Sequence, residues 1–418
     1  MLTQDRLAQQ GAVLPRWVTT YYEQPLDLVH GEGRHVTDRE GRRYLDFFAG
    51  ILTTSVGYNI PEIKDAVQEQ LATGIVHTST LYFIDAQVRL AERVIGLTAI
   101  DDAVAFFCNS GSEANETALL AAVCRSHSPH VVTLADSYHG RTFGTCAVSQ
   151  LTGWQPSPFT PLLVTAASNG RDGRSVRECL ADLERRLDAQ DHPPAALLVE
   201  PIQGLGGFWR PPPELLRGYQ AITADRGAIL ICDEVQTGWG RTGTHFWGYQ
   251  AHELQPDLIT FAKGAANGFA IGGVVGRREV LDSLPAKSIS TFGGNPLATT
   301  AALSTIDYLL NHDLQSNAES IGRILHQGLR RLRTDQRRIA DVRANGLMIG
   351  VDLTAADGVT PDPFAARHVL EACRSRGLLV GLGGAAGATL RIAPPLTVTR
   401  EEAQEALRIL CDAMAILP

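Results

Sequence analysis

A lysine and an aspartate stand directly after two short apolar segments, where α/β proteins place many of their reactive side chains. Lys263 follows Leu258–Ala262, and Asp233 follows Ile229–Cys232. Lysine is rarely buried, and a desolvated lysine with a lowered pKa can form a Schiff base with an aldehyde and then carry protons. A buried carboxylate needs a cation beside it, such as a pyridinium nitrogen. Each residue alone also fits an ordinary role, as a surface lysine or as an aspartate that caps a helix.

A third segment has the residues of an anion site. Residues 109–116 follow an apolar run that ends at Cys108 and open a helix, with Ser110, Gly111 and Ser112 at its start. These residues leave backbone N–H groups and the positive helix end available to a phosphate. The segment alone fits an ordinary capped helix equally well. Three such strand ends on one sheet edge favour pyridoxal 5′-phosphate (PLP), which combines an aldehyde, a pyridine ring and a phosphate.

Six short apolar segments rich in β-branched residues are separated by amphipathic stretches of helix length. This alternation predicts buried parallel strands with helical crossovers, and therefore an α/β doubly wound domain in the middle of the chain. The carboxyl ends of parallel strands share one edge, where the three motifs would meet. The segments are Val104–Cys108, His130–Leu134, Ala195–Val199, Ala228–Cys232, Leu258–Phe261 and Ile271–Val275.

The two ends of the chain have a different pattern. Residues 29–48 alternate between polar and apolar, which predicts hairpin strands ahead of the large domain. We predict that residues 1–55 join a small α+β domain, that residues 56–304 form the large domain, and that residues 305–418 complete the small one. Periodicity in the last part predicts helices at 298–310, 318–332, 363–376 and 400–416, and a strand at 343–353.

Composition excludes several classes of protein. A chain of 418 residues is expected to form more than one domain, and its net charge of −8 without a basic tract argues against a nucleic-acid partner. No apolar run approaches the ~20 residues that cross a bilayer, and the N-terminus lacks a signal-peptide core. The seven cysteines are odd in number and scattered, which predicts reduced packing residues, no metal site and a cytoplasmic protein.

Short motifs follow one another along most of the chain: Tyr44–Phe47, Ser110–Glu116, Tyr138–Thr142, Glu200–Gly204, Asp233–Gly238, Lys263–Gly264, Thr291–Pro296 and Leu390–Pro394. They resemble the motifs of the class III aminotransferases, the subgroup II or ornithine aminotransferase-like group of PLP enzymes. The resemblance covers about residues 27–415 and implies fold type I, with a mostly parallel central sheet and a small α+β domain from both chain ends. Within the group, segments 247–249 and 346–350 are most similar to alanine–glyoxylate aminotransferases of the second type.

The resemblance implies a role for each candidate residue. Lys263 would hold the cofactor as a Schiff base and move the proton between the substrate Cα and the cofactor, and Asp233 would keep the pyridine nitrogen protonated. Tyr138 would stack on the ring, Gln236 would bind its 3′-oxygen, and Glu200 would orient the ring-binding network. The implied cofactor-binding set is Ser110, Gly111, Ser112, Tyr138, His139, Glu200, Asp233, Gln236, Lys263 and Thr291.

Two of the matching residues concern the substrate and the assembly. Arg391 matches the family arginine that clamps the substrate α-carboxylate, a task suited to a guanidinium fork. Thr291 matches a threonine that reaches the cofactor phosphate of a neighbouring subunit. The resemblance therefore implies a homodimer with shared active sites, or a tetramer built from such dimers.

Departures from the family pattern bear on the substrate. Relatives that act on ornithine or 4-aminobutyrate carry a glutamate that pairs with the substrate arginine, and that position is Leu205 here, so Arg391 is expected to stay available to carboxylates. The segment Gly57–Pro61 has Tyr58 where most relatives have histidine, and it lacks their second histidine before the proline. The sequence leaves open what Tyr58 and Asn59 do.

The expected reaction is transfer of an amino group from alanine or another small amino acid, including β- and ω-amino acids, to a small keto acid such as glyoxylate or pyruvate. Racemases, epimerases and a decarboxylase of the same family use the same lysine and aspartate, and they stay open as alternatives. A nucleotide-dependent oxidoreductase is disfavoured, because residues 204–207 lack the strand–Gly-x-Gly-x-x-Gly–helix context. A cofactor-free binding protein is disfavoured by the joint presence of Lys263, Asp233 and Arg391.

Overall fold

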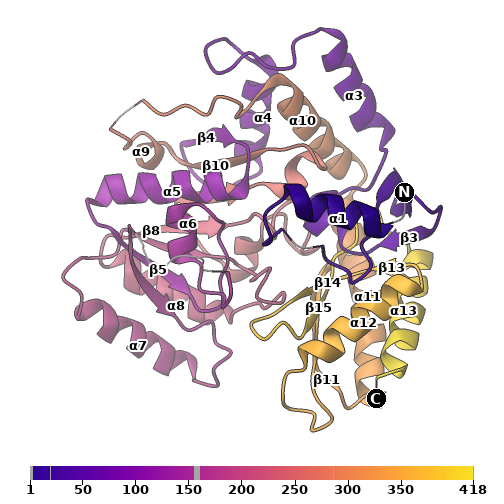
Figure 1. Cartoon of the computed structure of the whole chain (residues 1–418). Helices are drawn as coiled ribbons and strands as arrows, with labels where there is room; N and C mark the ends of the chain where they lie inside the picture. The colour runs from indigo at the N-terminus through magenta and orange to yellow at the C-terminus, as the bar shows by residue number, and fades with distance from the viewer. Residues whose placement is uncertain (1–2, 19, 155–160, 286, 418) are drawn as a thin grey trace.

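The computed structural model describes residues 3–18, 20–154, 161–285 and 287–417, and its centre is a seven-stranded sheet (Figure 1). Both faces of this sheet are buried, because alternate residues of its strands enter different cores. Leu197 and Leu230 pack with α8 (Pro213–Ala224), whereas Leu198 and Ile231 pack with α5 (Gly111–Ser126). In sheet order the strands are β4 (Ala103–Cys108), β10 (Gly272–Arg277), β9 (Leu258–Phe261), β8 (Ile229–Asp233), β7 (Ala196–Val199), β5 (His130–Leu134) and β6 (Leu163–Ala167).

The sheet is mostly parallel, as expected, but the direction of one strand differs from the prediction. β10 is antiparallel to both of its neighbours, β4 and β9, while the other neighbouring strands pair in parallel. Only residues 262–271 separate β9 from β10, and a parallel connection needs about a dozen residues or more. The sequence also failed to predict β6, which is a partly exposed edge strand with a weak apolar pattern.

Two smaller sheets combine the two ends of the chain. The strands β1 (Leu28–Glu32), β2 (His35–Asp38) and β3 (Arg43–Asp46) form the predicted antiparallel hairpins, and β13 (Leu378–Leu379) pairs in parallel with β3. The other sheet has the order β11 (Ile339–Asn345), β12 (Met348–Leu353), β15 (Thr389–Ile392) and β14 (Gly381–Gly383). The exact division at residues 55 and 304 stays a prediction.

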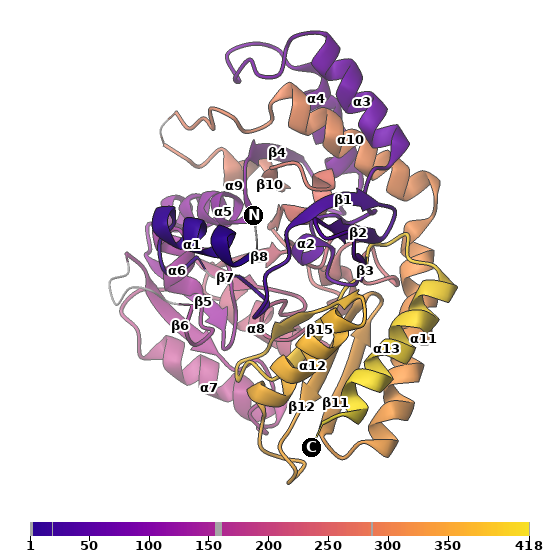
Figure 2. The same cartoon turned by 45° about the vertical axis from the view of Figure 1, so that its right-hand side comes forward.

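The predicted strand 343–353 is wrong, because the chain turns back within it. Gly346 has φ +54° between β11 and β12, so one expected strand is an antiparallel hairpin. Figure 2 shows this sheet beside α11 (Leu314–Asp335), α12 (Pro363–Ser375) and α13 (Arg400–Ala415). These helices and α10 (Pro296–Asn311) agree with the predicted helical segments.

The remaining helices are short or surround the central sheet. None of the helices in the described part of the chain is both long and apolar enough to span a membrane. They are α1 (Thr3–Val13), α2 (Ala49–Leu52), α3 (Pro61–Ala72), α4 (Asp85–Gly96), α6 (Phe143–Val148), α7 (Val176–Asp188) and α9 (Arg278–Leu281), with the 3₁₀ turns η1 (Gly248–His252) and η2 (Lys263–Ala266).

Candidate active site

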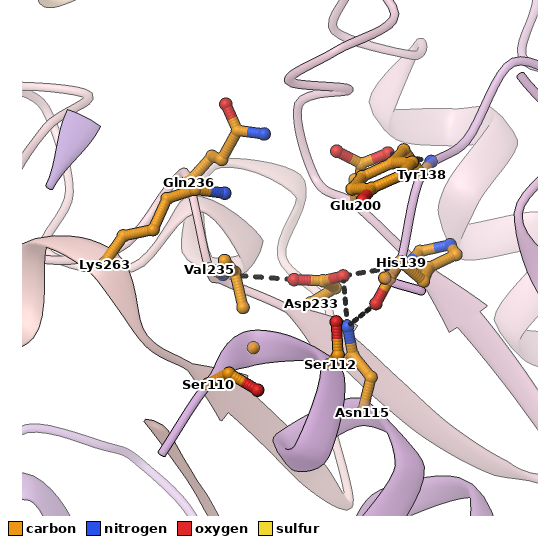
Figure 3. Close-up of a pocket in the computed structure, with 12 residues that line it drawn as sticks. Ser110, Ser112, Asn115, Tyr138, His139, Glu200, Asp233, Val235, Gln236 and Lys263 are labelled. Carbon is orange, nitrogen blue, oxygen red and sulfur yellow. Dashed lines mark hydrogen bonds and ion pairs between the residues drawn. The ribbon is translucent and has the colours of Figure 1, made fainter. Parts of the chain in front are cut away.

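A cavity of about 170 Å³ lies at the carboxyl edge of the central sheet, where several strand ends meet (Figure 3). Glu200 directly follows β7, Asp233 ends β8 and Lys263 lies two residues after the end of β9, while α5 begins after β4. The order of these neighbouring strands brings together side chains that are far apart in the sequence. The lining residues are Ser110, Gly111, Ser112, Asn115, Tyr138, His139, Gly140, Glu200, Asp233, Val235, Gln236 and Lys263.

The Asp233 carboxylate is buried and held by three donors. Its Oδ2 atom lies 2.8 Å from His139 Nδ1 and 2.7 Å from Asn115 Nδ2, and its Oδ1 accepts from the Val235 N–H at 3.1 Å (Figure 3). These three hydrogen bonds fix the orientation of the carboxylate. Because the carboxylate only accepts, His139 Nδ1 must carry a hydrogen. The arrangement presents a fixed negative charge to the cavity.

The Lys263 side chain is partly buried, and the pKa of its amine is lowered to about 8. Burial is the main cause because it penalises the charged amine, and the positive charge of Arg391 acts in the same direction against the opposing effect of Asp233. The side chain extends into the cavity beside Gln236 (Figure 3). About a tenth of the amine is therefore neutral and nucleophilic at pH 7, a far larger fraction than for a lysine with its ordinary pKa.

The start of α5 forms the opposite end of the cavity. Ser110 caps the helix by accepting from the Glu113 N–H at 3.2 Å, and Ser112 Oγ accepts from the Arg141 N–H at 3.2 Å. A side chain at Gly111 would place its Cβ 3.0 Å from a Val235 methyl group. Glycine therefore lets the start of α5 pack closely against Val235, and the helix end favours an anion.

Glu200 and Gln236 complete the wall of the cavity in different ways. Glu200 accepts from the backbone N–H of Tyr138 at 2.9 Å and of Gly204 at 2.8 Å. Burial and the neighbouring Asp233 raise the pKa of Glu200, while His139 opposes this rise. Gln236 Oε1 is buried without a hydrogen-bond partner, which is uncommon for a buried polar atom and indicates a position that a ligand completes.

These features fit PLP. A carboxylate for the ring nitrogen, a lysine amine for the aldehyde and a helix start for the phosphate face one cavity. Nine of the ten predicted cofactor-binding residues line it, and Thr291 is the exception because it is exposed and does not line the cavity. Their individual roles stay predictions.

Sequence reasoning gave no site role to three lining residues, Asn115, Gly140 and Val235. Asn115 donates to Asp233 and to the His139 carbonyl, and it accepts from Thr260 Oγ1 at 2.5 Å. It lies one helical turn after Gly111, so the helical period could have placed it on the same face. Its partners, however, come from distant parts of the chain.

Arg391 lies close to the cavity without lining it. It comes from β15 and is buried, and burial lowers its pKa to about 10. Its Nε donates to the Leu382 carbonyl at 3.0 Å, and its Nη1 donates to the Gly204 carbonyl at 3.0 Å. Among the hydrogen bonds and ion pairs of the described residues, none joins Arg391 to a carboxylate. The guanidinium is therefore a buried cation held by two backbone carbonyls.

Comparisons with known proteins place the chain in one family. A family model described as "Aminotransferase class-III" matches residues 18–414. The human protein "Alanine--glyoxylate aminotransferase 2, mitochondrial" is 34% identical over 95% of this chain and 83% of its own length. An Arthrobacter phospholyase solved with phosphoethanolamine superimposes with a TM-score of 0.91 at 31% identity, covering 99% of this chain and 100% of that one. An S-selective transaminase from Arthrobacter sp. with alanine bound has a TM-score of 0.89 at 26% identity, covering 99% and 98%.

Proposed function

This chain belongs to the class III aminotransferase family, and we propose that it moves an amino group from alanine or another small amino acid to glyoxylate or pyruvate. The family relationship supports amino-group transfer and gives no support to the racemase, epimerase or decarboxylase alternatives. The observation that carries the proposal is that Lys263 and Asp233 face one cavity beside the start of α5. β- and ω-amino acids of similar size are further candidate donors.

PLP, the cofactor of the family, supplies an electron sink for the bond that breaks at the substrate Cα. The Asp233 carboxylate would keep the ring nitrogen protonated, and Asn115 and His139 would hold that carboxylate in place. The neutral amine of Lys263 would take the proton from the substrate Cα and deliver it to the cofactor. The Tyr138 side chain would cover the ring and limit the entry of water.

The substrate carboxylate would bind Arg391. Leu205 stands where some relatives have a glutamate partner for this arginine, and its backbone carbonyl instead accepts from the Gly384 N–H at 2.9 Å. A planar guanidinium suits a carboxylate well. The human relative has alanine and glyoxylate in its name, and the Arthrobacter transaminase was solved with alanine, which supports small substrates.

We also propose a homodimer, or a larger assembly of such dimers, in which Thr291 reaches the partner's cofactor phosphate. The support is a set of large apolar side chains that are exposed in the single chain, namely Leu81, Tyr82, Phe83, Ile289 and Phe292. The ring centroid of Phe292 lies 4.8 Å from that of His77, so the segments around residues 75–83 and 289–292 meet. A large exposed apolar surface commonly marks an interface.

A reducing, cytoplasmic location is part of the proposal. All seven cysteines are free thiols in the structure, and four of them are buried. Buried free cysteines behave as small apolar packing residues, and free thiols are typical of reducing compartments. A sulfhydryl titration under native and denaturing conditions would check that the thiols stay reduced in protein isolated from cells.

A second candidate function is elimination of phosphate from a phosphorylated amino alcohol. The Arthrobacter phospholyase favours it, because that protein is 31% identical to this chain and was solved with phosphoethanolamine. A guanidinium such as that of Arg391 binds phosphate as well as carboxylate. Elimination differs from transfer in that it consumes water and no keto acid, and it releases inorganic phosphate, ammonia and an aldehyde.

The test combines one spectrum with two product assays on purified protein loaded with PLP. We expect L-alanine to bleach the visible absorption of the bound cofactor, glyoxylate to restore it, and pyruvate and glycine to form together. Lys263→Ala should lose this cycle. Phosphate release from phosphoethanolamine without a keto acid, together with no response to alanine, would overturn the aminotransferase proposal in favour of the lyase.

A further inference from the structure

Two aromatic rings lie against the guanidinium of Arg391. Its central carbon is 4.9 Å from the ring centroid of Phe48 and 5.3 Å from that of Phe208, and both rings are buried. The Tyr21 ring stacks on Phe48 with a centroid distance of 5.9 Å and an interplanar angle of 18°. Cation–π contacts are strongest where water is excluded. Because both rings are buried, both contacts stabilise the position of the guanidinium.

The edges of the same guanidinium are fixed by the backbone. Its two hydrogen bonds go to the carbonyls of Leu382 and Gly204, and the Leu382 N–H donates to the Tyr21 hydroxyl. The side chain passes so close to Gly383 that a Cβ there would lie 2.9 Å from Arg391 Cδ. Turning the guanidinium away would leave two carbonyls without this donor and would lose both ring contacts.

The backbone that presents the two rings is itself unusual. Phe208 has φ +56° and is fully buried, and Ala49, Ile51 and Leu52, which follow Phe48, also have positive φ. Bulky residues adopt this left-handed conformation rarely and at a cost, and such strain persists where the surroundings impose it, often at functional sites. Phe208 therefore adopts a conformation that the chain would otherwise avoid, and Phe48 directly precedes a turn built from such residues.

We infer that Phe48 and Phe208 are positioning residues that lock Arg391 in one orientation, so that both the amino donor and the keto acceptor must present a carboxylate to it. This inference rests on the proposed aminotransferase function and names the substrate class more closely. Among the described residues, Arg391 makes no hydrogen bond or ion pair to a carboxylate, and Leu205 occupies the position of the family glutamate. Amines without a carboxylate would leave the buried guanidinium without a negatively charged partner.

The binding test uses propionate, which is alanine without its amino group, and propionamide, its uncharged analogue. Both are titrated calorimetrically into the PLP-loaded wild type and into Phe208→Leu and Phe48→Leu. We expect the wild type to prefer propionate, and each variant to bind propionate about tenfold more weakly, as the loss of one desolvated cation–π contact implies. The affinity for propionamide should stay low in all three proteins.

Phe47→Leu is the matched control. Phe47 is as fully buried as Phe208 and is the neighbour of Phe48, but it packs into the main core cluster, whereas Phe48 and Phe208 belong to a separate cluster. Its replacement should change the affinity for propionate less than about twofold. Equal weakening in Phe47→Leu, or affinities within about twofold of wild type in both Phe208→Leu and Phe48→Leu, would overturn the inference.

A kinetic comparison separates this inference from the proposed function. Isopropylamine has a methyl group in place of the alanine carboxylate, so the locked arginine predicts turnover of alanine and at most traces with isopropylamine. In Phe208→Leu, KM for alanine should rise with little change in kcat. Wild-type turnover of isopropylamine at the rate of alanine would contradict the requirement for a carboxylate at Arg391. Selective propionate binding that the two variants weaken, without any amino transfer, would support the lock while refuting the proposed function.

Discussion

At the scale of single residues, burial distinguishes Lys263 from the other lysines. The chain has only three lysines, and Lys64 and Lys287 are exposed. Because an amine must lose its proton before it can attack an aldehyde, the low pKa of Lys263 matters most in the protein before the cofactor binds. The same burial that would be costly for a charged lysine therefore prepares this one for its proposed role.

We expect the rate at which the cofactor-free protein captures PLP to rise with pH through a midpoint near 8. The reason is that burial favours the neutral amine of Lys263, so its pKa lies near 8 rather than at its ordinary value of 10.5. Stopped-flow absorbance between about pH 6.5 and pH 10 would give the profile. Lys64→Ala and Lys287→Ala should leave it unchanged. A rate that climbs only above pH 10 would show that Lys263 is not desolvated.

At the scale of elements, the contacts before the turn α2 give Tyr58 a role that the sequence left open. Tyr58 donates to Asp46 Oδ2 at 2.6 Å, and Asp46 Oδ1 accepts from the backbone N–H groups of Phe48 and Ala49. Asp46 is buried, and burial raises its pKa while these hydrogen bonds oppose the rise. The Tyr58 hydroxyl therefore anchors the start of the left-handed turn that directly follows Phe48. Asn59, in contrast, donates to Glu32 on the surface.

Tyr58→Phe tests whether this anchor serves the substrate site. The variant should lose about 1–3 kcal/mol of unfolding free energy, because a buried carboxylate loses a donor, and KM for alanine should rise. Tyr44→Phe is the control, since Tyr44 donates to the buried Asp38 at 2.8 Å outside the site. Denaturant unfolding and steady-state kinetics would measure both effects. If both variants alter KM equally, the Tyr58 contact has no specific link to Arg391.

At the scale of the whole molecule, exposed apolar side chains set an expectation about assembly. Phe83 is 80% exposed and Leu81 is 77% exposed in the single chain. We expect Phe83→Asp to shift the protein from dimer to monomer in sedimentation velocity and to weaken PLP binding, because Thr291 would no longer reach the partner's cofactor. Phe364, at the start of α12, is 84% exposed and provides the control variant Phe364→Asp. A Phe83→Asp dimer with normal PLP affinity would refute the shared site.

The sequence by itself determined the chemistry and most of the elements. Lys263, Asp233 and the start of α5 stand at strand ends that apolar runs mark, and the helices of the last hundred residues follow from the helical period. These features are local, because a strand end or a helical face is specified by residues within a few positions of one another. For the same reason, the motifs carried the resemblance to the family without any knowledge of the fold.

The tertiary structure decided what depends on contacts between distant residues. The direction of β10 and the hairpin at Gly346 depend on connections that are too short to join parallel strands. Hydrophobic periodicity does not report strand direction. The surroundings of Arg391 come from Phe48, Gly204, Phe208 and Leu382, which no local pattern connects. The same holds for Asn115, whose partners Asp233 and Thr260 lie on neighbouring strands. Burial and hydrogen bonding between such groups exist only once the chain is folded, so only the folded chain could assign them.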